Sequence, residues 1–123
     1  MILRRVILRA AALAGAAALV PRGTSGHAVL VRSSPARRAT LGQPPRRVEL
    51  TFNERLEPAY SSVSVWSAGG AQVDTRDVAV GSADPRELSV GLPELPPGTY
   101  TVRFRVLSID GHVVESSFPF TVR

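Results

Sequence analysis

Alternation of apolar and polar residues, over short segments separated by proline, glycine and serine, constrains the fold of this chain more than any other feature. A period of two is typical of half-buried strands, because successive side chains of a strand point to opposite faces of a sheet. The clearest case is 99–107, where Tyr100, Val102, Phe104 and Val106 share one parity. No segment of the chain has a convincing helical period, and none repeats another. The pattern therefore predicts an all-β domain.

Seven segments carry this alternation or a short apolar run. We expect strands over residues 28–31, 48–52, 62–66, 71–75, 87–92, 99–107 and 114–122, with a tight hairpin turn at Gly69-Gly70 and a loop over 33–45. Many short strands, with a turn about every 8 to 12 residues, are typical of β-sandwiches and small β-barrels. The predicted fold class is all-β, a Greek-key β-sandwich or small barrel of about seven strands.

Pro119 lies inside the last predicted strand, on the parity opposite to that of Phe118 and Phe120. Proline has no N–H to donate to a neighbouring strand, so it is confined to edge strands, first positions and bulges. We therefore expect the terminal strand to lie at a sheet edge or to carry a bulge at Pro119.

The first 26 residues are predicted to be a cleavable export signal. Arg4, Arg5 and Arg9 form a basic start, residues 10–20 an apolar stretch, and residues 24–26 a run of small residues before the cut. The apolar stretch is shorter than the roughly 20 residues of a membrane span, which favours cleavage over anchoring. The start fits a twin-arginine signal, with a general secretory signal as the alternative. Either route places the product in the periplasm or an equivalent extracytoplasmic space.

The predicted domain, residues 27–123, has a nearly balanced charge. The full chain has 15 basic and 10 acidic residues and a formal net charge of +5. Four arginines and no acid lie in residues 1–26, which leaves 11 bases against 10 acids in the domain. A net charge near +1 argues against nucleic acid or an anionic membrane as a partner. The chain has no cysteine, so disulfides and thiolate metal sites are excluded.

His27 would become the first residue if the signal is cut after Gly26. A terminal histidine can bind one metal ion through both its α-amine and its ring Nδ1, and binding of the first nitrogen makes binding of the second intramolecular. The amine must lose its proton to bind, so the affinity for the metal falls as the pH is lowered. Nitrogen and carboxylate ligands in a square arrangement suit Cu(II). The alternative is an ordinary surface histidine beside a cleavage site that lies elsewhere.

Asp110 and His112 are candidates to complete this site. His112 is the only other histidine of the chain. Residues i and i+2 of an extended chain project from the same face, so both side chains can point at one ion from the end of a strand. Asp-Gly is also a common turn pair, so Asp110 can be a turn residue that bonds its own backbone and His112 an exposed hairpin residue. Glu54 ends a predicted strand and is either a weak or outer ligand or a solvated glutamate.

The sequence contains no recognisable catalytic arrangement. Cysteine is absent, no serine lies near a histidine in a known nucleophile motif, and no glycine-rich phosphate loop occurs. The acidic residues are scattered, and none are paired for acid–base work. We therefore expect the protein not to be an enzyme.

Five segments carry a family resemblance. They are His27-Ala28-Val29-Leu30, Ser33-Ser34-Pro35-Ala36, Leu50-Thr51-Phe52-Asn53-Glu54, Pro97-Gly98-Thr99-Tyr100-Thr101-Val102 and Ser108-Ile109-Asp110-Gly111-His112. In this order they resemble CopC-type periplasmic copper-binding proteins, and the resemblance spans essentially the whole predicted domain. It implies a small cupredoxin-like or immunoglobulin-like β-barrel that holds Cu(II) and takes part in copper resistance, buffering or delivery.

The resemblance also implies the roles of individual residues. His27 would supply an amine and Nδ1, His112 an imidazole and Asp110 a carboxylate, with Glu54 at the position of a family glutamate. Some family members have a methionine-rich Cu(I) site, but the only methionine here is Met1, so we expect a Cu(II)-only protein. We expect a monomer whose partners are the copper ion and a separate membrane copper transporter of the CopD type.

Two other functions fit parts of the pattern. Copper held by an N-terminal histidine also occurs in redox enzymes that oxidise polysaccharides, although a carboxylate ligand favours Cu(II) and opposes redox cycling. A metal-free immunoglobulin-like interaction module is the second alternative, because this architecture hosts many binding functions.

Overall fold

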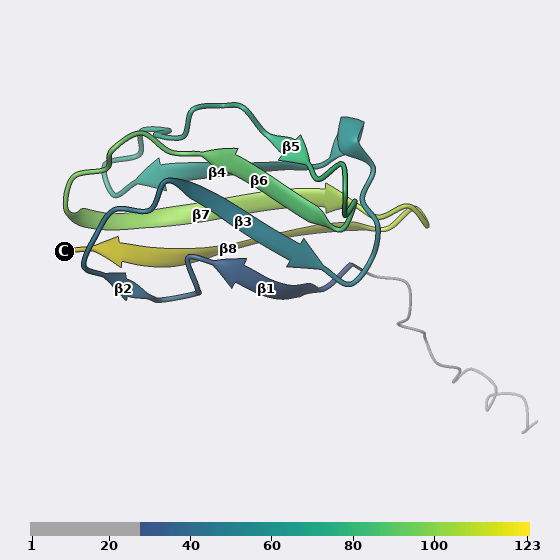
Figure 1. The fold of residues 1–123 in the computed structure, drawn as a ribbon, viewed down its shortest axis with the longest axis horizontal. Helices are drawn as coiled ribbons and strands as arrows, with labels where there is room; N and C mark the ends of the chain where they lie inside the picture. The colour runs from purple at the N-terminus through teal and green to yellow at the C-terminus, as the bar shows by residue number, and fades with distance from the viewer. Residues whose placement is uncertain (1–27) are drawn as a thin grey trace, which may run out of the picture.

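The protein, seen in a computed structural model that describes residues 28–123, is a sandwich of two four-stranded sheets (Figure 1). Its elements are β1 (Leu30–Ser34), β2 (Thr40–Leu41), β3 (Arg47–Phe52), the 3₁₀ helix η2 (Pro58–Tyr60), β4 (Ser62–Ser67), β5 (Ala79–Val80), β6 (Glu87–Gly91), β7 (Gly98–Leu107) and β8 (Val113–Val122). One sheet has the order β1-β3-β6-β5 and the other β2-β8-β7-β4. The all-β prediction is confirmed, with eight strands in place of about seven. Within the described residues, no helix is long and apolar enough to span a membrane.

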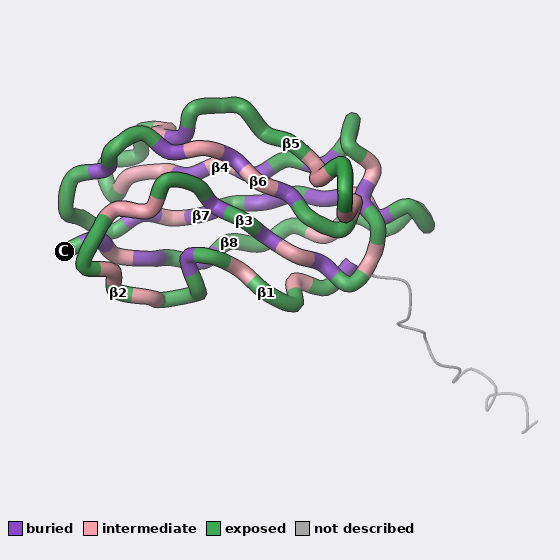
Figure 2. The backbone as a smooth tube through the Cα atoms, in the orientation of Figure 1, coloured by how far each residue is buried: buried purple, intermediate pink, exposed green. Residues whose placement is uncertain are grey.

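Alternate residues of the strands fill the space between the two sheets (Figure 2). On β7 the buried residues are Tyr100, Val102, Phe104 and Val106, which confirms the parity read from the sequence. On β3 and β8 the buried residues are Val48, Leu50, Phe52, Phe118, Phe120 and Val122, again on one parity of each strand. Burial of this continuous apolar layer is the main term that stabilises the fold.

Aromatic contacts join strands both between the two sheets and within one of them. The rings of Phe52 in β3 and Phe104 in β7 meet edge to face, with centroids 5.4 Å apart and planes at 70°. Tyr100 stacks on Phe120 at 5.5 Å between β7 and β8. Because Phe52 is the last residue of β3, its contact with β7 fixes where that strand ends relative to the other sheet.

Several segments differ from the sequence-based expectation, among them the two-residue strand β5, which was not expected. The first strand runs over Leu30–Ser34 instead of 28–31, and its register shifts between Leu30 and Arg32. The expected loop over 33–45 contains β2, which pairs in parallel with the end of β8. The expected strand over 71–75 shrinks to one bridge between Trp66 and Gln72.

The reason for the short pairing at 71–75 is a side chain that replaces the backbone partner. The turn at Gly69-Gly70 forms as predicted, with Gly70 at φ 92°. Val73 N–H then donates to Val65 O at 2.8 Å, but Val65 N–H donates to the carboxylate of Asp74 at 2.9 Å. The ladder between the two segments therefore stops at Asp74.

Pro119 is accommodated in an inner strand, not in an edge strand as expected. β8 lies between β7 and β2, yet β2 pairs only with Thr121 and Val122. The carbonyl oxygen of Pro119 accepts from the N–H of Arg38 at 2.7 Å, outside the β7 ladder. The N and O of one strand residue face the same side, so the missing N–H of Pro119 costs no bond to β7.

Candidate metal centre

The turn between β7 and β8 holds two of the predicted ligands. Ser108 closes it, because its N–H donates to His112 O at 2.9 Å and its carbonyl accepts from Gly111 N–H at 2.8 Å. Gly111 has φ 96°, a left-handed conformation that side chains disfavour, which explains glycine at this position. The backbone of the turn therefore places Asp110 and His112 on either side of a glycine at the tip.

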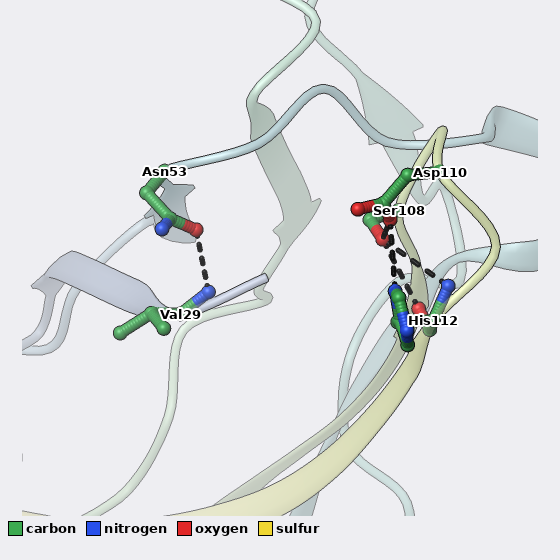
Figure 3. A network of polar contacts seen from close by, with 5 residues as sticks. All are labelled: Val29, Asn53, Ser108, Asp110 and His112. Atoms are coloured by element: carbon green, nitrogen blue, oxygen red, sulfur yellow. Dashed lines mark hydrogen bonds and ion pairs between the residues drawn. The ribbon is translucent and has the colours of Figure 1, made fainter. Parts of the chain in front are cut away.

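Asp110 and His112 lie against each other in this turn (Figure 3). Nδ1 of His112 is 3.2 Å from Oδ1 of Asp110. The hydroxyl of Ser108, which is fully buried, donates to the same carboxylate oxygen and accepts from the His112 N–H at 3.3 Å. The Ser108 hydrogen bond, followed by the contact with His112, holds the pKa of Asp110 below its ordinary value of 3.8. Asp110 is thus ready to act as an anionic ligand in neutral solution.

The prediction that these two side chains come together holds, but the geometric reason given for it was wrong. The sequence left two arrangements open, an extended chain with residues i and i+2 on one face and an Asp-Gly turn, and residues 109–111 form the turn. Two features bring the side chains together: the left-handed Gly111 and the Ser108 hydroxyl, which bonds both partners. Asp110 is therefore both a turn residue and a candidate ligand.

A second segment, residues 53–57, connects this turn to the start of the described chain, and we call it the connector. At one end Asn53 bonds Val29 twice: Asn53 N–H donates to Val29 O at 3.0 Å, and Asn53 Oδ1 accepts from Val29 N–H at 2.7 Å (Figure 3). At the other end Arg55 O accepts from Ile109 N–H at 2.9 Å. Residues 28–29 and the turn therefore lie at the same end of the sandwich (Figure 1).

The other two predicted ligands are His27 and Glu54. His27 lies outside the described residues, and Ala28, which follows it, is buried in the core. Glu54 lies in the connector and is half-buried, and its carboxylate makes no hydrogen bond or ion pair within residues 28–123. Its assignment as a weak or outer ligand stays a prediction.

The Asp110–His112 pair fits a metal ion in two ways. At metal–ligand distances of about 2.0–2.2 Å, as divalent zinc has with nitrogen and oxygen, two atoms 3.2 Å apart subtend roughly 100° at a shared ion. That angle suits neighbouring corners of a square arrangement. Alternatively, Nδ1 of His112 donates to Asp110 and the ring binds metal through Nε2. Within residues 28–123 no three histidine, cysteine or acidic side chains gather as a metal site.

Two residues of this region received no role from the sequence alone: Ser108 and Asn53. Ser108 lies two positions before Asp110, but nothing in the sequence showed that its hydroxyl would be buried beneath the carboxylate. Asn53 directly follows a strand, a position where an amide can bond a neighbouring backbone. That signal was present, but its partner Val29 is 24 residues away and only the fold brings it near.

Comparison with known proteins places this chain in a family. The CopC domain family matches residues 30–123. The chain is 35% identical over 125 residues to copper resistance protein C of Xanthomonas campestris pv. juglandis, covering 96% of this chain and 92% of that one. It is 31% identical over 104 residues to copper transport protein CutJ of Bacillus subtilis, covering 84% of this chain but only 19% of CutJ.

A solved structure shows the same fold. The crystal structure of CopC from Methylosinus trichosporium OB3b superposes with a TM-score of 0.73 at 43% sequence identity. The match covers 78% of this chain and 93% of that one.

Proposed function

The chain belongs to the CopC domain family, and from this we propose that it binds Cu(II) and acts in copper resistance, buffering or delivery as a carrier rather than an enzyme. The observation that carries the proposal is the turn in which a carboxylate and an imidazole lie 3.2 Å apart. This pair provides one oxygen and one nitrogen donor, the ligand types that Cu(II) accepts readily.

The other donors are proposed to come from His27 after removal of residues 1–26. Ala28, the residue that follows His27, is buried, and residues 28–29 lie at the same end of the sandwich as the turn (Figure 1). The amine and Nδ1 of His27 would then add two nitrogens to Asp110 and His112. Glu54 remains a proposed outer or weak ligand at this end.

The ligand types favour Cu(II) over Cu(I). Soft sulfur ligands select Cu(I), whereas imidazole, amine and carboxylate suit Cu(II). The chain has no cysteine and one methionine, Met1, which lies in the proposed signal. We therefore propose a single kind of copper site.

The setting of the protein follows from the same proposal. Cleavage of residues 1–26 accompanies export to the periplasm or an equivalent compartment, by the general secretory or the twin-arginine route. The partners are the copper ion and a membrane copper transporter of the CopD type, and the protein acts as a monomer. The similarity to one part of copper transport protein CutJ supports a role beside a larger copper transporter.

An intact mass of the exported protein, with and without one equivalent of Cu(II), tests the proposal. We expect a polypeptide that begins at His27 and gains the mass of one copper ion. A matched variant with one alanine inserted before His27 loses the terminal histidine and should bind Cu(II) more than tenfold more weakly. Equal affinity of the two forms would rule out amine ligation.

Two further results would point to other functions. Sustained peroxide production from ascorbate, or cleavage of a polysaccharide, would favour a copper redox enzyme. Failure of the exported protein to bind Cu(II) at all would favour a metal-free interaction module.

A further inference from the structure

Asn53 holds the start of the described chain to the rest of the sandwich. Its backbone N–H donates to Val29 O at 3.0 Å, and its side-chain oxygen accepts from Val29 N–H at 2.7 Å (Figure 3). Val29 therefore has both of its backbone polar groups on one residue. A single backbone bond would leave Val29 able to rotate about it. The pair restricts both the position and the direction of the chain just ahead of β1.

The core holds Asn53 itself in place. Phe52, directly before it, is fully buried and its N–H donates to Arg86 O at 2.9 Å. Leu56, three residues later, is also buried, and its N–H donates to Pro85 O at 3.0 Å. A residue between two such anchors has little freedom to move.

The connector carries this fixed position across to the metal turn. Arg55 O accepts from Ile109 N–H, and Leu56 forms a bridge with Ser108. Ser108 in turn bonds Asp110 and His112. An unbroken path of hydrogen bonds and short backbone steps therefore runs from Val29, through Asn53, to both candidate ligands of the turn.

From this path we propose that Asn53 is a positioning residue, which sets the N-terminal copper ligands opposite Asp110 and His112 before the ion arrives. The inference rests on the proposed function. Asn53 does not contact the ion; it acts through Val29 and the buried Ala28, the two residues that follow His27.

The physical basis is preorganisation. A terminal histidine can bind Cu(II) by itself through its amine and Nδ1, so a loose N-terminus would still hold copper, but without the turn. Holding the N-terminus beside the turn raises the effective concentration of the second pair of ligands. It also lowers the ordering cost of binding. Losing one hydrogen bond of usual net strength corresponds to about a two- to tenfold change in an equilibrium constant.

Three variants of the exported protein test the role. Asn53→Ala removes the oxygen that accepts from Val29 N–H. Asn53→Asp keeps an acceptor at the same place and should restore the bond. Gln43→Ala is the matched control, since it removes an exposed amide side chain in the loop between β2 and β3, at the opposite end of the sandwich (Figure 1).

Hydrogen exchange of the Val29 amide in the metal-free protein measures directly whether the Asn53 side chain holds Val29. We expect exchange at least tenfold faster in Asn53→Ala than in the unaltered protein, with protection regained in Asn53→Asp and unchanged in Gln43→Ala. Unchanged exchange in Asn53→Ala would refute the claim that the Asn53 side chain holds Val29, whatever the result of the copper titration.

Copper binding tests the positioning role of Asn53. In Asn53→Ala we expect Cu(II) affinity to fall two- to tenfold. We also expect the electron paramagnetic resonance spectrum at one equivalent of Cu(II) to gain the signal of a His-Ala-Val-Leu peptide complex, in which the turn ligands are missing. A merely structural role would lower the unfolding midpoint and leave affinity and spectrum as they were, and that result would overturn the proposal.

Different results would refute the proposed function and the positioning role of Asn53. If the unaltered protein does not bind Cu(II), the proposed function falls and the positioning role falls with it. If the unaltered protein binds Cu(II) and Asn53→Ala binds it with the same affinity and spectrum, only the positioning role falls.

Discussion

Truncation of Phe52 to alanine should be among the most destabilising single changes in this domain. The side chain is 0% exposed, and its ring contacts Phe104 edge to face across the two sheets. Phe→Ala in a core costs about 3–5 kcal/mol, from lost burial and from the cavity left behind. The aromatic pair accounts for about 0.5–1.5 kcal/mol of this. Against a total stability of about 5–15 kcal/mol, Phe52→Ala should remove about a fifth or more.

Equilibrium unfolding of the metal-free protein in guanidinium, followed by far-ultraviolet circular dichroism, measures this loss. The midpoint should fall while the slope stays the same, which is the signature of lost stability in a two-state transition. The control is Tyr60→Ala: Tyr60 lies in η2 and is 64% exposed, so its removal should change stability by no more than about 0.5 kcal/mol. The two variants lose an aromatic ring of nearly equal size.

A loss below about 1 kcal/mol for Phe52→Ala, or a loss equal to that of Tyr60→Ala, would refute the reasoning. The first result would mean that the two sheets do not pack through this ring. A double-mutant cycle with Phe104→Ala tests the same contact by a second route, with an expected coupling of about 0.5–1.5 kcal/mol.

Three other predictions concern the candidate ligands and a carboxylate away from them. Asp110→Ala and His112→Ala should each weaken Cu(II) binding at least tenfold, about 1.4 kcal/mol or more, in a chelator competition titration; a change below threefold in both would contradict the ligand assignment. A hydrogen bond from the Thr75 hydroxyl, followed by one from the Gly91 N–H, holds the pKa of Asp77 below its ordinary value of 3.8. Ionised Asp77 therefore stabilises the fold at a pH above its pKa in the unfolded chain. This contribution is lost as the pH falls through the lower pKa that Asp77 has in the folded protein. Thr75→Val should therefore raise the pKa of Asp77 and move that loss to higher pH, as read by an NMR titration of the carboxyl carbon; an unshifted titration would refute it. Gly91→Ala should cost about 1–3 kcal/mol in chemical denaturation, because a Cβ would lie 2.6 Å from Thr75 Oγ1 and 3.1 Å from Asp77 Oδ1; a neutral effect would show that this loop yields easily.

The long strands were predictable because their pattern is local. From Thr99 to Leu107 every second residue of β7 is buried and the others are half-buried or exposed, and this period is visible without knowledge of any partner strand. The two-residue strands β2 and β5 have no period that a sequence can display. β2 exists because Thr121 N–H meets Ala39 O at 2.9 Å, a pairing between segments about 80 residues apart. Such contacts are set by the packing of the sandwich.

The candidate site was predictable in its residue types and less so in its geometry. Aspartate and histidine around a glycine suggested two ligands close together, and the structure places them at 3.2 Å. The buried hydroxyl of Ser108 and the amide of Asn53 could not be found in this way, because their roles depend on burial and on a partner distant in sequence. His27 was singled out for its place after the predicted signal, and its role as a ligand stays a prediction.

The β7–β8 hairpin also provides a molecular distance scale. Its rungs run from Leu107–Val113, next to the turn, to Gly98–Val122 at the far end, and nine steps of about 3.3 Å make a length of about 30 Å. Cu(II) is paramagnetic and weakens nuclear magnetic resonance signals of nearby atoms more than those of distant ones. Signal intensity along the hairpin should therefore recover rung by rung away from the turn, and the steepness of that recovery would locate the ion without a crystal.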